Sequence, residues 1–294
     1  HFITSEMVEA DLTHANLSSA SLAGCDLSGA VLDGSNISGA DFSDSIMIGA
    51  SMNDIDMGDG NETPVFSNAL LEEDVRDLFE SMSIDVGDAR LRVMASDEFD
   101  HILDLHEEWL RSKGAKGKRL KLDMISVSGA NVANRNLTMA TIRRSDMVNS
   151  NFSGSVLTMS VFGYSTFNGS SFAKANLSGA DFRKARLDNA DFSESIMNRA
   201  QISGAKESRP TNMTKVTAAQ ANLRVAEVDG AIFADADLSS ARLGISFLSG
   251  ANLSNARLPE SLNKRGGAQE LAKGIHKAPP SQLKNTEKRW STDR

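Results

Sequence analysis

The chain has 294 residues, which suits one large or two ordinary domains, and only 5% of them are aromatic. Its formal net charge of −8 argues against a surface built as a whole to bind nucleic acid. The single cysteine, Cys25, excludes an internal disulfide framework and favours a reducing compartment such as the cytoplasm. No apolar run reaches the ~18 residues that a membrane span needs. Because the sequence begins with His1, a removed secretion signal stays open.

Residues 1–59 form a first array with an apolar residue at every fifth position and, in most units, a small residue two places earlier. Cys25 takes one of the small positions, where we expect a buried filler rather than a reactive thiol. Residues two apart face the same side of an extended segment, and the Ser, Gly, Asp and Asn between them suit turns. A chain that turns every five residues while keeping two of them inward must coil. The pattern predicts an all-β solenoid.

Units such as ADLTH, ANLSS, ADFRK, ADFSE and ADLSS resemble the bacterial pentapeptide-repeat family. The resemblance covers about two-thirds of the chain. It implies a right-handed quadrilateral β-helix with four pentapeptides per coil. Residues twenty apart would then stack at the usual distance between strands, ~4.8 Å.

Residues 60–118 break the five-residue period, and helical spacing replaces it. We expect a loop around Pro64 and then a helix from Asn68 to Met82. A second helix is expected from Ser96, as N-cap, to about Lys113. This α-helical insert is expected to cover the open end of a second array.

The second array is predicted over residues 119–262. Phe152, Phe172 and Phe192 lie twenty apart and should stack in one aromatic ladder, with Phe162 and Phe182 in another. The residues predicted to form the structural core are Leu137, Phe152, Leu157, Phe162, Phe167, Phe172, Leu177, Phe182, Leu187 and Phe192. Each is expected to be core rather than part of a ligand site.

The register slips after Ile202, because Leu223 follows it by 21 residues instead of 20. One inserted residue near Pro210 would produce a protruding loop or bulge. Residues 263–294 are rich in Lys and Arg and are predicted to be a flexible, disordered tail, with a short helix at Ala268–Lys273.

No catalytic constellation stands out in the sequence. Phosphate-binding loops, HExxH and CxxC motifs are absent. His101 and His106 are five apart on one expected helix and point to different faces, so they are poor metal partners. His106 near Trp109 is expected to be a half-buried packing residue. We therefore predict no enzyme activity, no catalytic residue, no metal site and no cofactor.

Charge separates the two arrays. Residues 1–59 contain ten acidic residues and no Lys or Arg, whereas residues 119–262 contain sixteen basic against twelve acidic residues. We predict a non-enzymatic scaffold or protein-interaction module whose partner is another protein of unknown identity, and homo-oligomer formation stays open. The candidate interaction surface consists of Asp11, Asp26, Asp41, Asp56, Arg209 and Pro210.

Two other functions remain open from the sequence. One is an acidic DNA mimic that binds a DNA-handling enzyme such as DNA gyrase, which the resemblance suggests. The four aspartates lie fifteen apart, however, so they should wind across the faces instead of lining one. The other is a secreted bacterial effector with a repeat domain.

Overall fold

A computed structural model gives the fold and divides it into two compact units. One unit is His1–Val93 with Met124–Ser126, and the other is Met94–Asp123 with Val127–Arg294. Each unit is described by itself. The structure describes residues 5–58, 62–87, 89–201, 208–224, 226–244, 247 and 250–263. Ile202 and the predicted tail beyond Asn263, with its expected short helix, therefore lie outside the described residues.

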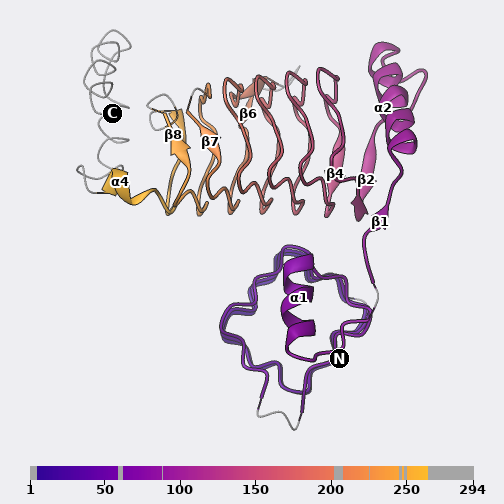
Figure 1. The fold of residues 1–294 in the computed structure, drawn as a ribbon, viewed down its shortest axis with the longest axis vertical. Coiled ribbons are helices and arrows are strands. Elements are labelled where there is room, and N and C mark those ends of the chain that lie inside the picture. The colour runs from indigo at the N-terminus through magenta and orange to yellow at the C-terminus, as the bar shows by residue number, and fades with distance from the viewer. Residues whose placement is uncertain are drawn as a thin grey trace. The chain divides into compact units, whose positions relative to one another are not determined.

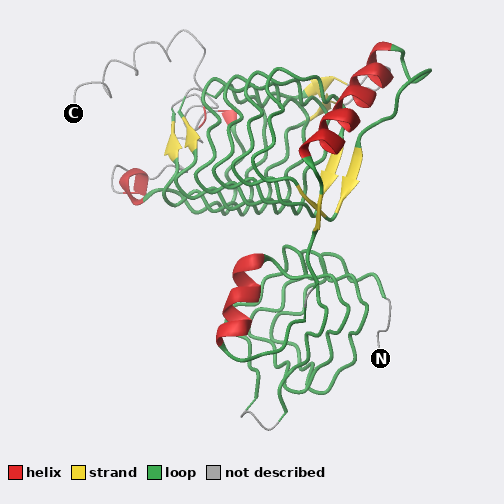
Figure 2. Ribbon diagram, turned by 45° about the vertical axis from the view of Figure 1, so that its right-hand side comes forward, coloured by secondary structure: helices red, strands yellow, loops and turns green. Residues whose placement is uncertain are grey.

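The first array is a β-helix whose coils repeat every twenty residues. Parallel bridges join Glu6 to Asp26 and Asp26 to Ile46, so four pentapeptides complete one coil. Figure 1 shows these coils along their axis as a four-sided outline. In Figure 2 most of both arrays is drawn as loop, because the coils touch through bridges of one residue each.

Left-handed backbone at the corners explains the composition of the repeat. The residue two places after an apolar centre has a positive φ, as at His14 (56°), Gly34 (66°) and Asp44 (56°). Glycine adopts this conformation without strain, and Asn and Asp tolerate it better than most residues. The repeat therefore collects Gly, Asn and Asp at this position, and each corner turns the chain onto the next face.

The first array continues beyond residue 59, where the sequence placed its end. Bridges join Asp41 to Val65 and Ile46 to Leu70, which are 24 residues apart in sequence. Four residues are therefore inserted, and Pro64 lies in this loop without ending the array. The ring of Phe66 stacks on that of Phe42 with centroids 5.0 Å apart.

Helix α1, Glu73–Ser81, covers the end of the first array and starts later than predicted. Asn68, the predicted start, instead forms a corner of the coil with a φ of 58°. Phe79 is 1% exposed and its ring lies 4.7 Å from that of Phe66. Arg76, also 1% exposed, donates to the carbonyls of Gly87 at 2.8 Å and Ala69 at 3.3 Å. These bonds hold the segment after α1 against the last coil.

Strand β1, Arg92–Val93, pairs in parallel with β3, Ile125–Ser126. Helix α2, Ser96–Arg111, follows β1. Its N-cap is Ala95, without a side-chain hydrogen bond, so the prediction that Ser96 caps this helix is wrong. The acidic residues of its first turn still suit the positive end of the helix dipole.

Helix α2 packs on the first coil of the second array. Phe99, Leu103 and His106 are buried on its inner side. Arg135 of the array binds Asp104 of the helix at 2.5 Å and Glu107 at 3.4 Å. The helix therefore covers this end of the array by both apolar packing and ion pairs.

The second array is a β-helix with the same twenty-residue coil. Strand β2, Lys121–Asp123, pairs in parallel with β4, Thr141–Arg143. Single bridges continue the column from Thr141 to Val161 and on to Asp181. Between residues 127 and 197, the N–H of each apolar centre donates to a carbonyl of the next coil, as from Phe152 to Ser171 at 2.7 Å. The coils are thus joined along their whole length.

Phenylalanines fill the middle of this array. Phe152, Phe172 and Phe192 stack with centroids 4.9 and 5.0 Å apart and nearly parallel planes. Phe162 and Phe182 stack with a tilt of 37°, 4.8 Å apart. The ten residues proposed for the core, from Leu137 to Phe192, are each no more than 1% exposed.

An insertion after Met197 is larger than the sequence indicated. Asp181 bridges to Asn212 and Ile196 to Glu227, each 31 residues on, so eleven residues are inserted instead of one. Strands β5, Ala200–Gln201, and β6, Ser208–Arg209, pair in antiparallel fashion at the base of this insertion. Eleven residues equal two five-residue repeats plus one residue. Counting the five-residue period shows only that one extra residue, so the sequence could not reveal the other ten.

The array then regains its register. Strand β7, Asn222–Leu223, pairs in parallel with β8, Arg242–Leu243, and the last bridge joins Asp237 to Arg257. Helix α4, Glu260–Asn263, follows. Within the described ranges, no helix is long and apolar enough to cross a membrane.

Candidate functional site: a basic face beside the inserted hairpin

One face of the second array carries a clear excess of basic over acidic residues. We call basic face the outward residues of the pentapeptides centred on Leu122, Ile142, Phe162, Phe182, Met213, Phe233 and Leu253, together with β6. Its basic residues are Lys121, Arg143, Arg144, Arg183, Lys184, Arg209 and Lys215. Its acidic residues are Asp123, Asp181 and Asp235.

The other three faces are close to neutral in their described outward positions. One has Arg186 and Arg257 against Asp146, Asp188 and Asp237, and another has Lys174, Arg224 and Arg242 against Asp191 and Glu194. The third has Arg199 against Glu227 and Asp229. The positive excess of the second array is therefore a property of one face.

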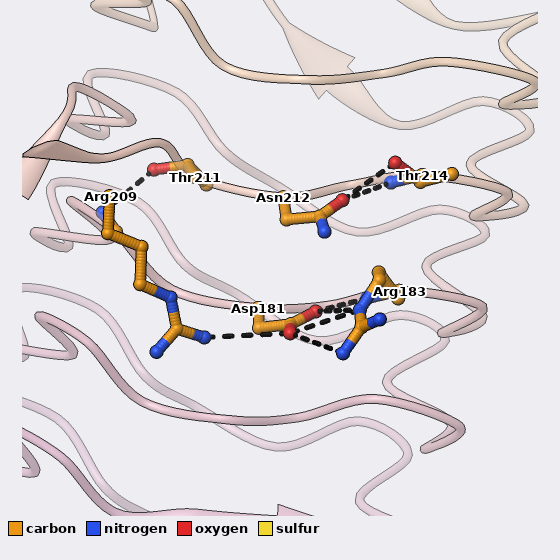
Figure 3. A network of polar contacts seen from close by, with 7 residues as sticks. Asp181, Arg183, Arg209, Thr211, Asn212 and Thr214 are labelled. Atoms are coloured by element: carbon orange, nitrogen blue, oxygen red, sulfur yellow. Dashed lines mark hydrogen bonds and ion pairs between the residues drawn. The ribbon is translucent and has the colours of Figure 1, made fainter. Parts of the chain in front are cut away.

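Asp181 is the centre of a polar network on the basic face, shown in Figure 3. Its residue is only 6% exposed. Arg183 reaches the carboxylate with Nε at 3.1 Å from both oxygens and with Nη2 at 3.0 Å from Oδ2. Arg209 of β6 adds its Nη2 at 3.5 Å from the same oxygen. One buried negative charge thus holds two arginines, whose side chains are 49% and 31% exposed.

The hairpin base sits against Gly179 because that residue has no side chain. A Cβ at Gly179 would lie 2.6 Å from Cβ of Ala200 and 3.2 Å from the carbonyl oxygen of Arg209. The N–H of Gly179 donates to Oγ1 of Thr211 at 3.1 Å, and this hydroxyl donates to the Leu177 carbonyl at 2.9 Å. Arg209 is therefore held in place by the packing of the strand that carries it.

Tyr164 and Arg143 lie on adjacent coils of the basic face. The guanidinium carbon of Arg143 lies 5.6 Å from the centre of the Tyr164 ring, which is a cation–π contact. Arg144 forms an ion pair with Asp123, with Nε at 2.8 Å from Oδ1. The tyrosine is 5% exposed, and Arg143 lies over its ring.

The predicted surface residues do not come together. Asp11, Asp26, Asp41 and Asp56 belong to four different bridge columns, one on each side of the first array. Each bonds the backbone of its own turn: the N–H groups of Thr13, Ser28, Ser43 and Gly58 donate to the four carboxylates. Turn geometry accounts for all four. Arg209 belongs to the Asp181 network, and Pro210 follows it.

Sequence reasoning missed Asp181 and Arg183. Both occupy ordinary repeat positions, and the unit ADFRK was taken as a marker of the fold alone. The available signal was the recurrence of basic residues forty positions apart, from Arg143 to Arg183 and from Arg144 to Lys184. The eleven-residue insertion obscured this recurrence, because it separates Lys184 from Lys215 by 31 residues.

Among the described residues, Ser51, Asp33 and His14 form the polar cluster that most resembles a catalytic site. Partial burial raises the pKa of Asp33, but hydrogen bonds from Ser51 and Asn53 outweigh this, so that its pKa lies below the usual value. The Ser51 hydroxyl donates directly to Asp33 at 2.5 Å. In a catalytic triad the serine hydroxyl donates to a histidine that the carboxylate orients, whereas here the hydroxyl donates to the carboxylate itself, so these residues do not form a triad.

No metal centre forms in the part of the chain that the structure describes, where no group of three or more His, Cys, Asp or Glu could hold an ion. Cys25 is buried in the first array. The sequence predicted a half-buried His106, but this residue is fully buried. Its ring stacks on that of Trp109, with the centroids 5.6 Å apart. Its Nδ1 accepts the N–H of Leu120 at 3.0 Å.

The structure is thus a β-helix of five-residue units. A family model described as "Pentapeptide repeats" matches eight copies over residues 7–57, 170–206 and 211–255. The matched residues of both arrays are pentapeptide repeats. A search of curated proteins found no match.

Solved structures of pentapeptide-repeat proteins also align with the chain. HetL, involved in heterocyst differentiation regulation in the cyanobacterium Nostoc sp. strain PCC 7120, is 20% identical, with 87% of this chain and 88% of HetL covered and a TM-score of 0.29. The plasmid-mediated fluoroquinolone resistance protein QnrB1 is 13% identical over 95% of this chain and 92% of its own, with a TM-score of 0.26. Rfr23 from the cyanobacterium Cyanothece 51142 is 15% identical over 47% and 84%, with a TM-score of 0.21. The identification of pentapeptide repeats rests on the sequence match and not on these low scores.

Proposed function

We propose that the two arrays are right-handed quadrilateral β-helices that act as a rigid, non-enzymatic scaffold, and that the second array binds another protein through an outer face. The observation that carries this proposal is the Asp181 network. Two partly exposed arginines from different segments are held by one buried carboxylate, on a face with excess positive charge. Such preorganisation reduces the entropy that side chains lose on binding.

The packing of the array supports this function. Stacked aromatic rings fill the inside of the second array, and its described charged side chains lie on the outer faces. Interactions with a partner must then use those outer faces. Because the coils are joined along their length, outward side chains stay at regular spacing of ~4.8 Å per coil.

A DNA-mimic function for the first array has less support. A mimic of duplex DNA needs rows of negative charge along one surface, whereas the four aspartates lie on four different sides and bond their own turns. Residues 5–58 do contain nine acidic residues and no Lys or Arg. Acidic side chains spread over every side suit general repulsion between copies better than one docking surface.

Photo-crosslinking in the native host tests the proposed scaffold. A photoreactive phenylalanine analogue is placed in the full chain at one exposed position on each face of the second array, in four separate variants: Asn252, Thr217, Asn151 and Val156. We expect crosslinks to one protein from the Asn252 variant, because this residue lies on the basic face, and weak or no crosslinks from the other three. The proposal fails if none of the four variants crosslinks to a protein.

A further inference from the structure

We propose that the basic face binds an acidic polypeptide segment; this rests on the proposed scaffold function and names the chemistry of its partner. The basic residues of this face are aligned along the array. The N–H of Tyr164 donates to the Arg183 carbonyl at 3.1 Å, and the N–H of Lys184 donates to the Thr214 carbonyl at 2.9 Å. Successive coils therefore place Arg143 and Arg183 in one column and Arg144, Lys184 and Lys215 in the next.

These columns run along the array for several coils. Neighbouring coils are ~4.8 Å apart, so Arg143 and Arg183, two coils apart, are separated by about 10 Å along the axis. Lys184 and Lys215 are on adjacent coils. The basic residues thus form a ridge on a flat surface, and an extended or helical segment with several carboxylates can contact more than one of them at a time.

The arginine side chains on this face are positioned to bind carboxylates. On this same face Arg183 holds Asp181 through two nitrogens, and Arg144 holds Asp123 through Nε and Nη2. Both are the forked contacts that guanidinium groups make with carboxylates. Arg183 remains 49% exposed after its contact, so much of its guanidinium surface faces solvent. A carboxylate of the partner would thus make the same kind of contact with a guanidinium group that Asp181 and Asp123 already make on this face.

Protein fits this face better than nucleic acid. Nucleic-acid interfaces are strongly positive, and binding typically neutralises about 6–10 phosphates. The basic face has seven basic residues, of which three contact Asp123 or Asp181. A polypeptide segment that carries several carboxylates matches this weaker and mixed charge.

The test measures binding of a fluorescent twenty-residue polyglutamate peptide to the full chain by anisotropy at low and high salt. One variant is Lys184→Glu with Lys215→Glu. Its matched control is Lys174→Glu with Arg242→Glu, on another face, with the same change in charge. We expect binding that weakens with salt, falls about tenfold in the first variant, and stays within about twofold of wild type in the control. Melting temperatures equal to that of the wild type show that both variants keep the fold.

The proposal is overturned by any of four results. These are no binding of polyglutamate, equal weakening in both variants, tighter binding of a duplex DNA of the same total charge, and self-association of the chain that the Lys184 and Lys215 substitutions abolish. The last result would make a second copy the occupant. Crosslinking to a protein partner from another face, with no polyglutamate binding, would overturn this inference while leaving the scaffold function intact.

Discussion

Buried serines show how single residues close the turns of the second array. Six successive inward positions, where the repeat usually has alanine, hold Ser145, Ser150, Ser155, Ser160, Ser165 and Ser170, each no more than 2% exposed. In an alanine turn the N–H bonds the carbonyl three residues earlier, as from Ala175 to Phe172 at 3.0 Å. At Ser150 the N–H instead donates to Oγ of Ser170, and this hydroxyl donates to the Met147 carbonyl. A side chain from the next coil thus completes the turn.

The Ser170→Ala substitution should therefore destabilise the second array. It removes the hydroxyl that serves the N–H of Ser150 at 3.0 Å and the carbonyl of Met147 at 2.9 Å. Leaving buried backbone groups unpaired costs about 1–3 kcal/mol. Urea unfolding followed by circular dichroism measures this loss as a lower midpoint.

Ser155→Ala is the matched control for this prediction. The Ser155 hydroxyl donates at 2.6 Å to the Phe152 carbonyl, which also accepts the N–H of Ser155 at 3.2 Å. Removing the hydroxyl leaves that carbonyl paired, so the cost should stay below about 1 kcal/mol. A larger loss for Ser155→Ala than for Ser170→Ala would contradict the proposed role of the bridging hydroxyl.

At the scale of elements, helix α2 is attached to its array through a histidine that must be neutral. Burial lowers the pKa of His106, and the positive charge of Arg119 lowers it further. The Thr138 backbone and the Glu107 carboxylate oppose this shift without cancelling it. The Nδ1 atom accepts the Leu120 N–H, which a protonated ring could not do.

Stability should therefore fall when the pH drops below about 6.5, the usual pKa of histidine in an unfolded chain. Above this pH both states are neutral at His106 and its contribution is fully present. Below it, the unfolded state takes up a proton that the folded state resists, so the free energy of unfolding decreases as the pH approaches the lowered folded-state pKa. Thermal unfolding between pH 7.5 and 5 measures the effect.

His106→Gln should flatten this dependence, because a glutamine cannot titrate and can offer an acceptor oxygen. His101→Gln is the control on the same helix, at an exposed position, and should leave the wild-type pH dependence unchanged. The interpretation is wrong if His101→Gln, and not His106→Gln, removes the loss of stability at low pH.

Sequence reasoning gave the repeats and core positions but not how the arrays end. The apolar residue of each repeat is buried, so the repeats could be counted from the sequence. Phe152, Phe172 and Phe192 lie twenty residues apart, which is four repeats. The end of the first array depends on Arg76, a buried charge whose backbone partners, including Ala69 and Gly87, cannot be identified from spacing. The start of α1 was also misplaced, since the helical spacing of apolar residues continued into a coil that ends at Leu71.

At the scale of the whole molecule, the chain combines two arrays of opposite charge character. The acidic residues of the first array were evident in the sequence, but their spread over four sides required the bridge columns. The basic excess of the second array was also evident, whereas its concentration on one face was not. An insertion of eleven residues shifts every later residue relative to the earlier coils, so the faces could be assembled only from the observed pairing.

Residue-resolved amide hydrogen exchange on the full chain tests the central claim, that stacked coils form a stiff scaffold. The N–H groups of Phe152 and Phe172 donate between coils at 2.7 Å, whereas those of Ser153 and Ser193 bond Asn151 and Asp191 within their own turns. We expect slow exchange at Phe152 and Phe172 and at the equivalent position of every coil between residues 127 and 197, with faster exchange at Ser153 and Ser193. Exchange at Phe152 and Phe172 as fast as at the two serines would contradict a stiff, stacked array.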